Sequence, residues 1–197
     1  MKIFTADPHL GGAAGRGFTR EKLISRIING FNQRAKPEDT LYIIGDAVSY
    51  GNVGYTIGSE RIVTESLREK WAYYDAQINA KTIIIEGNHD YSNHVNPDFK
   101  LAFVDVGRYV ALLSHYPTTA AKNPLFDRCE QIRWHRIVSA AAVAADFVIH
   151  GHVHDGQKVT IDNRTGLVNI NVALDVRNFL PVKADEIISE FRQAIKQ

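Results

Sequence analysis

The chain has 197 residues, of which 45% are hydrophobic, and this size and composition suit one large domain with a sizeable core. The formal net charge is +1 and the Lys and Arg residues are scattered, which argues against a nucleic-acid binder with a basic stripe but leaves room for a local basic patch. Cys129 is the only cysteine, so no intrachain disulfide can form, and we expect a cytoplasmic location.

The first half of the chain alternates predicted strands and helices. Short apolar runs rich in β-branched or aromatic residues predict strands near 2–6, 40–44 and 82–86. Apolar residues at helical spacing predict helices over 19–34 and 59–79. This alternation is typical of βαβ units.

The second half of the chain is richer in strands. Further strands are expected near 100–105, 109–114 and 146–150, and further helices are expected near 130–144 and 184–196. Residues 159–172 predict a hairpin that turns at 163–166. The longest stretch of small and apolar residues, 137–149, is too short to span a bilayer, so we expect no membrane contact. The two halves together indicate a single α/β domain over 1–197, with two packed mixed β-sheets flanked by helices.

Two long loops, 47–60 and 116–130, each follow a predicted strand. Long loops in a compact domain often close over a substrate, but a plain surface connection is an equally open interpretation. Tyr50 and Tyr55 in the first loop could stack on a nucleobase or simply pack against the protein.

Polar side chains follow five of the predicted strands, at the point where each strand ends. The run TIIIEGNHD at 82–90 shows the pattern, because an apolar strand leads directly through Gly87 into Asn88, His89 and Asp90. The other four strands lead into Asp7 and His9, into Asp46, into His115, and into His152 and His154. The ligand crevice of open α/β sheets lies at the carboxyl ends of the strands, so we expect these side chains to gather at one rim.

The residue types at this rim are those that bind divalent metal ions. The candidate ligands are Asp7, His9, Asp46, Asn88, His115, His152 and His154. Oxygen ligands suit hard cations, and imidazole suits Zn, Mn, Fe, Co or Ni. These ligands are too many for one tetrahedral site and suit two metals that share a carboxylate, for which Asp46 is the natural candidate. Two-metal sites serve the hydrolysis of phosphate esters.

The histidines at the end of the fifth strand pose a geometric problem. His152 and His154 alternate along an extended segment, so their side chains could point to opposite faces, and a turn at Gly151 is needed to bring both to the rim. The neighbouring His150 is expected to support these two residues. The remaining histidines, His94 and His135, receive no role.

The motifs DxH, GD, GNHD, SH and GHVH occur in this order from Asp7 to His154, and the set resembles the calcineurin-like metallophosphoesterases. The tail NVALDVRNFLPVKADEI is also similar to that of small bacterial and phage phosphoesterases of this superfamily. The resemblance implies a four-layer α/β/β/α sandwich. It also implies two divalent metal ions, with manganese as the expected metal and Fe, Zn, Ni or Co as alternatives.

The resemblance further implies a role for each residue of the motifs. The first metal would be held by Asp7, His9, Asp46 and His154. The second metal would be held by Asp46, Asn88, His115 and His152. The catalytic residues would be His89, which faces the leaving group, and Asp90, which orients His89 or its loop.

Three functions are compatible with this interpretation. In the leading hypothesis, a hydroxide that bridges the two metals attacks a phosphate mono- or diester, and His89 protonates the leaving group. The substrate would be a phosphorylated small molecule or a nucleotide. The alternative is a non-catalytic protein-binding module on the same scaffold, although every ligand position is filled. The third is a nuclease of the same superfamily, against which the modest charge counts without excluding it.

Overall fold

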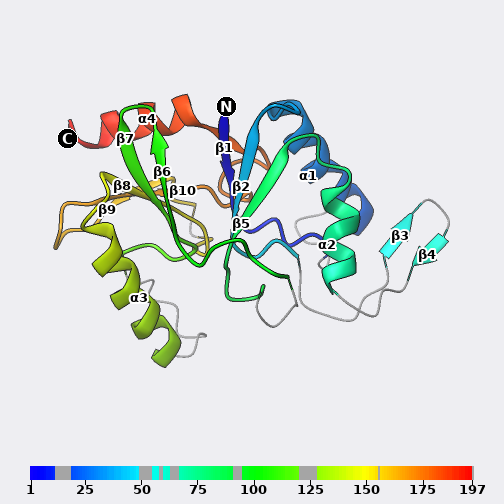
Figure 1. The fold of residues 1–197 in the computed structure, drawn as a ribbon, viewed down its shortest axis with the longest axis horizontal. Coiled ribbons are helices and arrows are strands. Elements are labelled where there is room, and N and C mark those ends of the chain that lie inside the picture. The colour runs from blue at the N-terminus through cyan, green and yellow to red at the C-terminus, as the bar shows by residue number, and fades with distance from the viewer. Residues whose placement is uncertain are drawn as a thin grey trace.

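Two mixed β-sheets pack against each other at the centre of the molecule, with helices outside them (Figure 1). The computed structural model describes residues 1–11, 19–48, 55–57, 60–62, 67–90, 95–119, 128–154 and 156–196. The predicted α/β class with two packed mixed sheets is confirmed.

The first sheet consists of β1 (Lys2–Thr5), β2 (Thr40–Ile44), β5 (Lys81–Ile85) and β11 (Val182–Lys183), in the order β11-β1-β2-β5. β1, β2 and β5 are parallel to one another, whereas β11 pairs antiparallel with β1. The register places Ile3 beside Leu41 and Ile43 beside Ile84. Because the three longer strands are parallel, their carboxyl ends meet at one edge of the sheet.

The second sheet consists of β6 (Ala102–Val106), β7 (Tyr109–Leu113), β8 (Phe147–His150), β9 (Val159–Ile161) and β10 (Val168–Asn171), in the order β6-β7-β8-β10-β9. β7, β8 and β10 are parallel, and the two edge strands pair antiparallel with their neighbours. The hairpin predicted over 159–172 is therefore confirmed as β9 and β10. The parallel strands β7 and β8 also end on the same side.

The core between the sheets follows from the two-residue period of the strands, which turns alternate side chains to one face. The first sheet contributes Phe4, Tyr42, Ile44 and Ile85, and the second contributes Ala111, Leu113, Phe147, Ile149, Val168 and Ile170. Helix α4 (Ala184–Ala194) adds Ile187 and Phe191 to the same core, with the Phe191 ring 4.7 Å from that of Phe147. The termini lie near this helix in Figure 1.

The other faces of the strands bury their side chains under helices. Helix α1 (Arg20–Arg34) begins after Thr19, whose side chain accepts a hydrogen bond from Lys22 N, and α2 (Leu67–Asp75) lies beside it. Side chains of Ile27, Phe31 and Tyr74 pack here against Leu41 and Ile43 of the first sheet. Helix α3 (Arg128–Ala142) covers Leu112 and Val148 of the second sheet. These layers form the expected α/β/β/α order.

No helix in the described ranges is long and apolar enough to cross a membrane.

The helix predicted over 59–79 is wrong in its first part. Residues Glu60–Ile62 form β4, which pairs antiparallel with β3 (Tyr55–Ile57), and the described helix α2 comprises Leu67–Asp75. The β-branched residues of these two short strands favour a hairpin, which outweighs the helical spacing of the apolar residues. The loops predicted over 47–60 and 116–130 are wrong in part, because Tyr55–Ile57 forms β3 and residues 128–130 belong to the helix Arg128–Ala142. Residues 49–54, 58–59 and 120–127 of these two predicted loops, including Tyr50, lie outside the described residues.

Candidate metal centre

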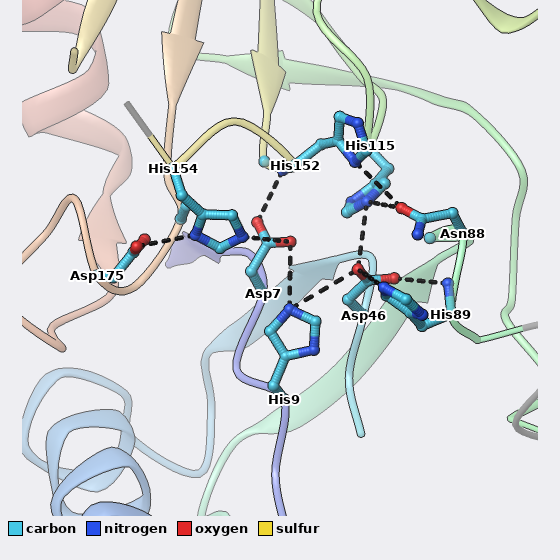
Figure 2. Close-up of polar contacts among 12 residues, drawn as sticks. Asp7, His9, Asp46, Asn88, His89, His115, His152, His154 and Asp175 are labelled. Carbon is cyan, nitrogen blue, oxygen red and sulfur yellow. Dashed lines mark hydrogen bonds and ion pairs between the residues drawn. The ribbon is translucent and has the colours of Figure 1, made fainter. Parts of the chain in front are cut away.

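The carboxyl ends of the parallel strands carry the side chains singled out in the sequence. β1 leads to Asp7 and His9, β2 to Asp46, β5 to Asn88, His89 and Asp90, β7 to His115, and β8 to His152 and His154. Figure 2 shows the side chains of all of these residues but Asp90 gathered around Asp7 and Asp46. Both sheets contribute, since β1, β2 and β5 belong to the first sheet and β7 and β8 to the second.

Four of these residues have a left-handed backbone conformation. The φ angle is 54° at Asp7, 42° at His9, 56° at Asp46 and 66° at His152. Residues other than glycine adopt positive φ rarely, and such residues cluster at functional sites where the surrounding structure holds them in place. Here Asp7 N donates to Gly45 O and His9 N donates to Asp46 O, so the turns after β1 and β2 fix each other.

One group of potential metal ligands consists of Asp7, His9 and His154, whose ligand atoms all lie within 4.8 Å of one another. The Nε2 atoms of His9 and His154 each lie 3.9 Å from Asp7 Oδ1. Asp7 Oδ1 is buried and has no hydrogen-bond partner among the described residues, whereas Asp7 Oδ2 accepts from His152 N at 2.8 Å. A buried carboxylate oxygen without a donor is costly unless a cation compensates its charge.

A second group consists of Asp46, Asn88, His115 and His152. His115 Nδ1 lies 3.0 Å from Ile44 O and donates to it, so the neutral ring carries its lone pair on Nε2. That Nε2 atom lies 2.9 Å from Asn88 Oδ1, and His152 Nδ1 lies 3.1 Å from the same oxygen. His115 Nε2 and Asn88 Oδ1 are both acceptors, and a cation bound by both would remove the repulsion between them.

Asp46 lies between the two groups. Its Oδ2 atom is 3.8 Å from His9 Nε2 on one side and 3.6 Å from His115 Nε2 on the other. Asp7, Asp46 and His115 also offer ligand atoms within 4.8 Å of one another. The Asp46 carboxylate is therefore the group nearest to both sets of ligands.

His89 and Asp90 follow Asn88 in the same turn. His89 Nε2 is 3.8 Å from Asp46 Oδ2, and His89 N donates to Asp46 Oδ1. The buried Asp90 carboxylate accepts from Asp46 N, Ala47 N and Gly87 N, each at 2.9 Å. Burial raises the pKa of Asp90 to about 6, and these three donors oppose the shift. Asp90 thus joins the turn that carries Asp46 to the turn that carries His89.

A tight turn brings both His152 and His154 to the rim despite their alternating positions. Val153 N donates to Gly151 O, His152 has a positive φ, and Asn171 Nδ2 holds Val153 O. The turn needs glycine at residue 151, because a Cβ there would lie 2.3 Å from Asp7 Oδ2. The turn that the sequence requires at Gly151 is therefore present.

Burial keeps most of the imidazole rings neutral. Burial lowers the pKa of His9 to about 4 and the pKa values of His115 and His152 to about 3. A neutral imidazole has the lone pair that a metal requires. Burial and the nearby Asp46 carboxylate raise the pKa of Asp7 above its ordinary value, so a cation beside Asp7 would stabilise its charged form. This set of donors fits divalent cations.

Exposure distinguishes two kinds of histidine at the rim. The side chains of His9, His89 and His154 are 34%, 38% and 43% exposed, whereas the His115 side chain is 0% exposed. The ring of His9 lies 5.7 Å from that of His89 and 6.1 Å from that of His154. These three rings form the side of the centre that solvent reaches, which we call the histidine mouth.

The sequence interpretation missed two residues next to the rim. Asp175 Oδ2 lies 2.8 Å from His154 Nδ1, and Asn171 holds the turn at Val153. A signal was present, because the run 168–174 is mostly apolar and leads into Asp175 as the other strands lead into their ligands. Of the other histidines, His150 is buried on β8, His135 contacts Arg164, and His94 lies outside the described residues.

Comparisons with known proteins agree with this chemistry. A family profile described as calcineurin-like phosphoesterase matches residues 3–156. AQ665, a protein of unknown function from Aquifex aeolicus, has a similar fold, with a TM-score of 0.61 and 22% identity over 96% of this chain and 98% of that chain.

Two further solved structures are more distant. Vps29 from Chaetomium thermophilum has 12% identity and a TM-score of 0.42, over 86% of this chain and 69% of its own. Yfce, a phosphoesterase from E. coli, has 17% identity and a TM-score of 0.42, over 86% of this chain and 77% of its own. A search of curated protein sequences finds no significant match.

Proposed function

The chain belongs to the calcineurin-like phosphoesterase family, and from this membership we propose that it is a metal-dependent hydrolase of phosphate mono- or diesters. The observation that carries the proposal is the convergence of acceptor atoms at the rim. Asp7 Oδ1 is buried with no donor in the part of the chain that the structure describes, and His115 Nε2 faces Asn88 Oδ1 at 2.9 Å. Acceptors that face one another in this way are stabilised by cations bound between them.

Two divalent cations account for the whole set of acceptors. Asp7, His9, Asp46 and His154 would hold the first, and Asp46, Asn88, His115 and His152 would hold the second. The position of Asp46 between the two groups supports its role as the shared ligand. Manganese is the metal we expect, because imidazole and carboxylate ligands together suit it, and Fe, Zn, Ni and Co are alternatives.

Bound metal ions in such a centre supply a nucleophile at neutral pH and stabilise the charge on the phosphoryl oxygens. The residues of the chain would admit the substrate and hold the ligands in position. The ester would enter through the histidine mouth, since His115 and His152 are buried behind it. Asp90 would fix the turn of Asp46 relative to the turn of His89, because its carboxylate accepts three hydrogen bonds from backbone N–H groups of these turns.

His89 would donate a proton to the leaving oxygen of the ester. Its ring belongs to the histidine mouth and lies 3.8 Å from Asp46 Oδ2, so it adjoins the centre and also faces entering substrate. A proton donor placed in this way stabilises the negative charge that develops on the leaving oxygen.

The substrate we propose is a phosphorylated small molecule or a nucleotide. The net charge of +1 gives little support to a large nucleic-acid partner. The single cysteine supports a reducing compartment, for which the cytoplasm is our proposal.

Turnover by the reloaded protein tests the proposed function. The purified protein is stripped with a chelator, reloaded with Mn²⁺, and offered nucleotides, cyclic nucleotides, phospho-sugars, phosphopeptides and nitrophenyl mono- and diesters. We expect hydrolysis that depends on the added metal. Metal binding without hydrolysis of any of these esters would favour the non-catalytic binding module instead.

Metal counts on variants test the assignment of the ligands. Asp46→Asn is expected to weaken both sites, because Asp46 is proposed to be shared. Asp7→Asn should weaken mainly the first site and His115→Ala mainly the second, while the wild type binds about two equivalents. Elemental analysis and calorimetric titration with Mn²⁺ measure these counts. If Asp46→Asn retains two sites of wild-type affinity, Asp46 is not the bridge.

A further inference from the structure

His154 is the most exposed of the proposed ligands, yet one of its ring nitrogens has a close carboxylate partner. Its Nδ1 atom lies 2.8 Å from Asp175 Oδ2, and its Nε2 atom lies 3.9 Å from Asp7 Oδ1 (Figure 2). The Asp175 side chain is only 16% exposed, compared with 43% for His154. The carboxylate is thus the more buried and better fixed partner of the pair.

The backbone that carries Asp175 is tied to both sheets. Ala6 N donates to Val172 O and Leu174 N donates to Ala6 O, which joins this segment to the end of β1. Val172 N donates to His150 O, which joins it to the end of β8. Asp175 therefore occupies a defined position relative to Asp7 in the first sheet and to the turn of His152 and His154 in the second.

We propose that Asp175 is a positioning residue, which selects the tautomer of His154 and turns its Nε2 lone pair toward Asp7 Oδ1. An ionised carboxylate only accepts hydrogen bonds, so the neutral ring must carry its proton on Nδ1, and Nε2 is then left for a cation. This inference rests on the proposed function, because the cation at Asp7 is the first of the two proposed metals.

His115, another proposed ligand, also has its Nδ1 proton bound by an acceptor, which here is a backbone carbonyl. Ile44 O accepts from His115 Nδ1 and leaves His115 Nε2 toward Asp46 and Asn88. His115 is enclosed by the protein, so a backbone carbonyl is sufficient to hold it. His154 is more than a third exposed and could otherwise rotate, which explains why a charged acceptor is needed at this position.

Two measurements on the purified full chain test this proposal. In metal-free protein at a pH where the ring is neutral, ¹H–¹⁵N NMR of the histidine rings reports the tautomer of His154. We expect a proton on Nδ1 in the wild type and a shift of population toward the Nε2-protonated form in Asp175→Ala. Calorimetric titration with Mn²⁺ should then show one site weakened roughly 10–100-fold, with the other site unchanged.

Two further variants serve as controls. Asp175→Asn keeps an uncharged acceptor and should fall between the wild type and Asp175→Ala in both measurements. Asp105→Ala removes an exposed carboxylate of β6 that no contact links to the centre, and it should match the wild type.

Unchanged tautomer and unchanged affinities in Asp175→Ala would overturn the proposal. Equal weakening of both sites together with a lower melting temperature would also overturn it, because that result describes a purely structural residue. A wild-type protein that binds neither Mn²⁺ nor any of the alternative metals Fe, Zn, Ni and Co would contradict the proposed function, and the tautomer measurement would still decide the role of Asp175.

Discussion

At the scale of single residues, the position of His89 is compatible with two roles, that of a metal ligand and that of a proton donor. Its Nε2 atom is as far from Asp46 Oδ2 as that of His9, so distance alone would allow it to be a ligand. The second group already contains four candidate ligands, and the His89 ring is 38% exposed at the histidine mouth. Since four candidates already account for the second site, contact of His89 with substrate is favoured over contact with metal.

The effect of His89→Ala should depend on the leaving group of the ester. An alkoxide leaving group needs a proton, whereas nitrophenolate is stable without one. We expect a loss of roughly 10²–10⁴-fold in kcat on an alkyl phosphate ester and a much smaller loss on a nitrophenyl ester of the same type. Steady-state kinetics on the two substrates gives the comparison.

Metal content is the control for that comparison. His89→Ala should retain both metal equivalents, and a loss of metal would identify His89 as a ligand. Equal losses of activity on both esters would mean that His89 positions the substrate and does not donate the proton.

At the scale of elements, the parts of the chain around the rim are held by a few buried polar residues. Asp90 joins the turns after β2 and β5, and Arg177 joins α4 to the segment after β10. The Arg177 side chain donates to both carboxylate oxygens of Glu190, and its Nε donates to Asn171 O. The Asn171 side chain donates to Val153 O and so stabilises the turn that carries His152 and His154. Helix α4 is thus connected to the candidate metal centre through hydrogen bonds.

Arg177→Met should destabilise the protein by about 3 kcal/mol, at the lower end of the range for breaking a buried ion pair, because Glu190 retains some contact with water. Urea unfolding of the metal-free protein measures the change. Arg136→Met, at an exposed position of α3, is the matched control and should change stability by less than about 0.5 kcal/mol. A loss in Arg177→Met as small as that expected for the control would show that the Arg177 contacts do not matter for stability.

The sequence predicted the elements well where their patterns were strong. The strand at Thr40–Ile44 was expected at the same residues, because its β-branched and aromatic run is bounded by polar residues. β11 was missed because it has only two residues and forms by pairing with β1, a long-range contact that no local pattern encodes. The hairpin of β3 and β4 was missed because residues 55–57 lie in a glycine-containing stretch that predicted a loop, whereas residues 60–62 were assigned to a helix on the spacing of the apolar residues that follow.

The candidate site, like the elements, was predicted where a local sequence pattern exists and was missed where the structure depends on long-range contacts. Repeated strand-to-polar junctions and ordered motifs predicted which side chains gather, because parallel strands end on the same side of a sheet. They could not predict the left-handed backbone at Asp7 and Asp46, which depends on hydrogen bonds between turns far apart in sequence. Asp175 was missed for a related reason, since its role depends on a contact with His154 across the rim.

At the scale of the whole molecule, each group of potential ligands draws on both sheets. Asp7 and His9 follow a strand of the first sheet, whereas their partner His154 follows a strand of the second. In the other group, Asp46 and Asn88 come from the first sheet, and His115 and His152 come from the second. A metal bound at either group would therefore hold the two sheets together at the rim.

Metal should raise the melting temperature of the protein, because a ligand that binds only the folded state stabilises it. At a free Mn²⁺ concentration 100 times the dissociation constant, the gain is about 2.7 kcal/mol for each site, or roughly 5–10 °C for a chain of this size. Differential scanning calorimetry with and without Mn²⁺ tests this. Asp46→Asn should show little increase, because Asp46 is proposed to be shared. A wild type whose melting temperature does not respond to Mn²⁺ would contradict binding of Mn²⁺ at these sites.

The division of the ligands between the sheets also sets an order of events during folding. An intermediate in which only β1, β2 and β5 have formed has Asp7, His9, Asp46 and Asn88 but none of His115, His152 and His154. Neither group can be complete until the strands on the far side of the core have docked. This docking includes long-range contacts such as the hydrogen bond from His152 N to Asp7 Oδ2, which joins residues 145 positions apart. Metal should therefore bind tightly only in the last step of refolding, and it should slow unfolding more than it speeds folding. The arrival of metal would then mark the moment at which the two halves of the chain have joined.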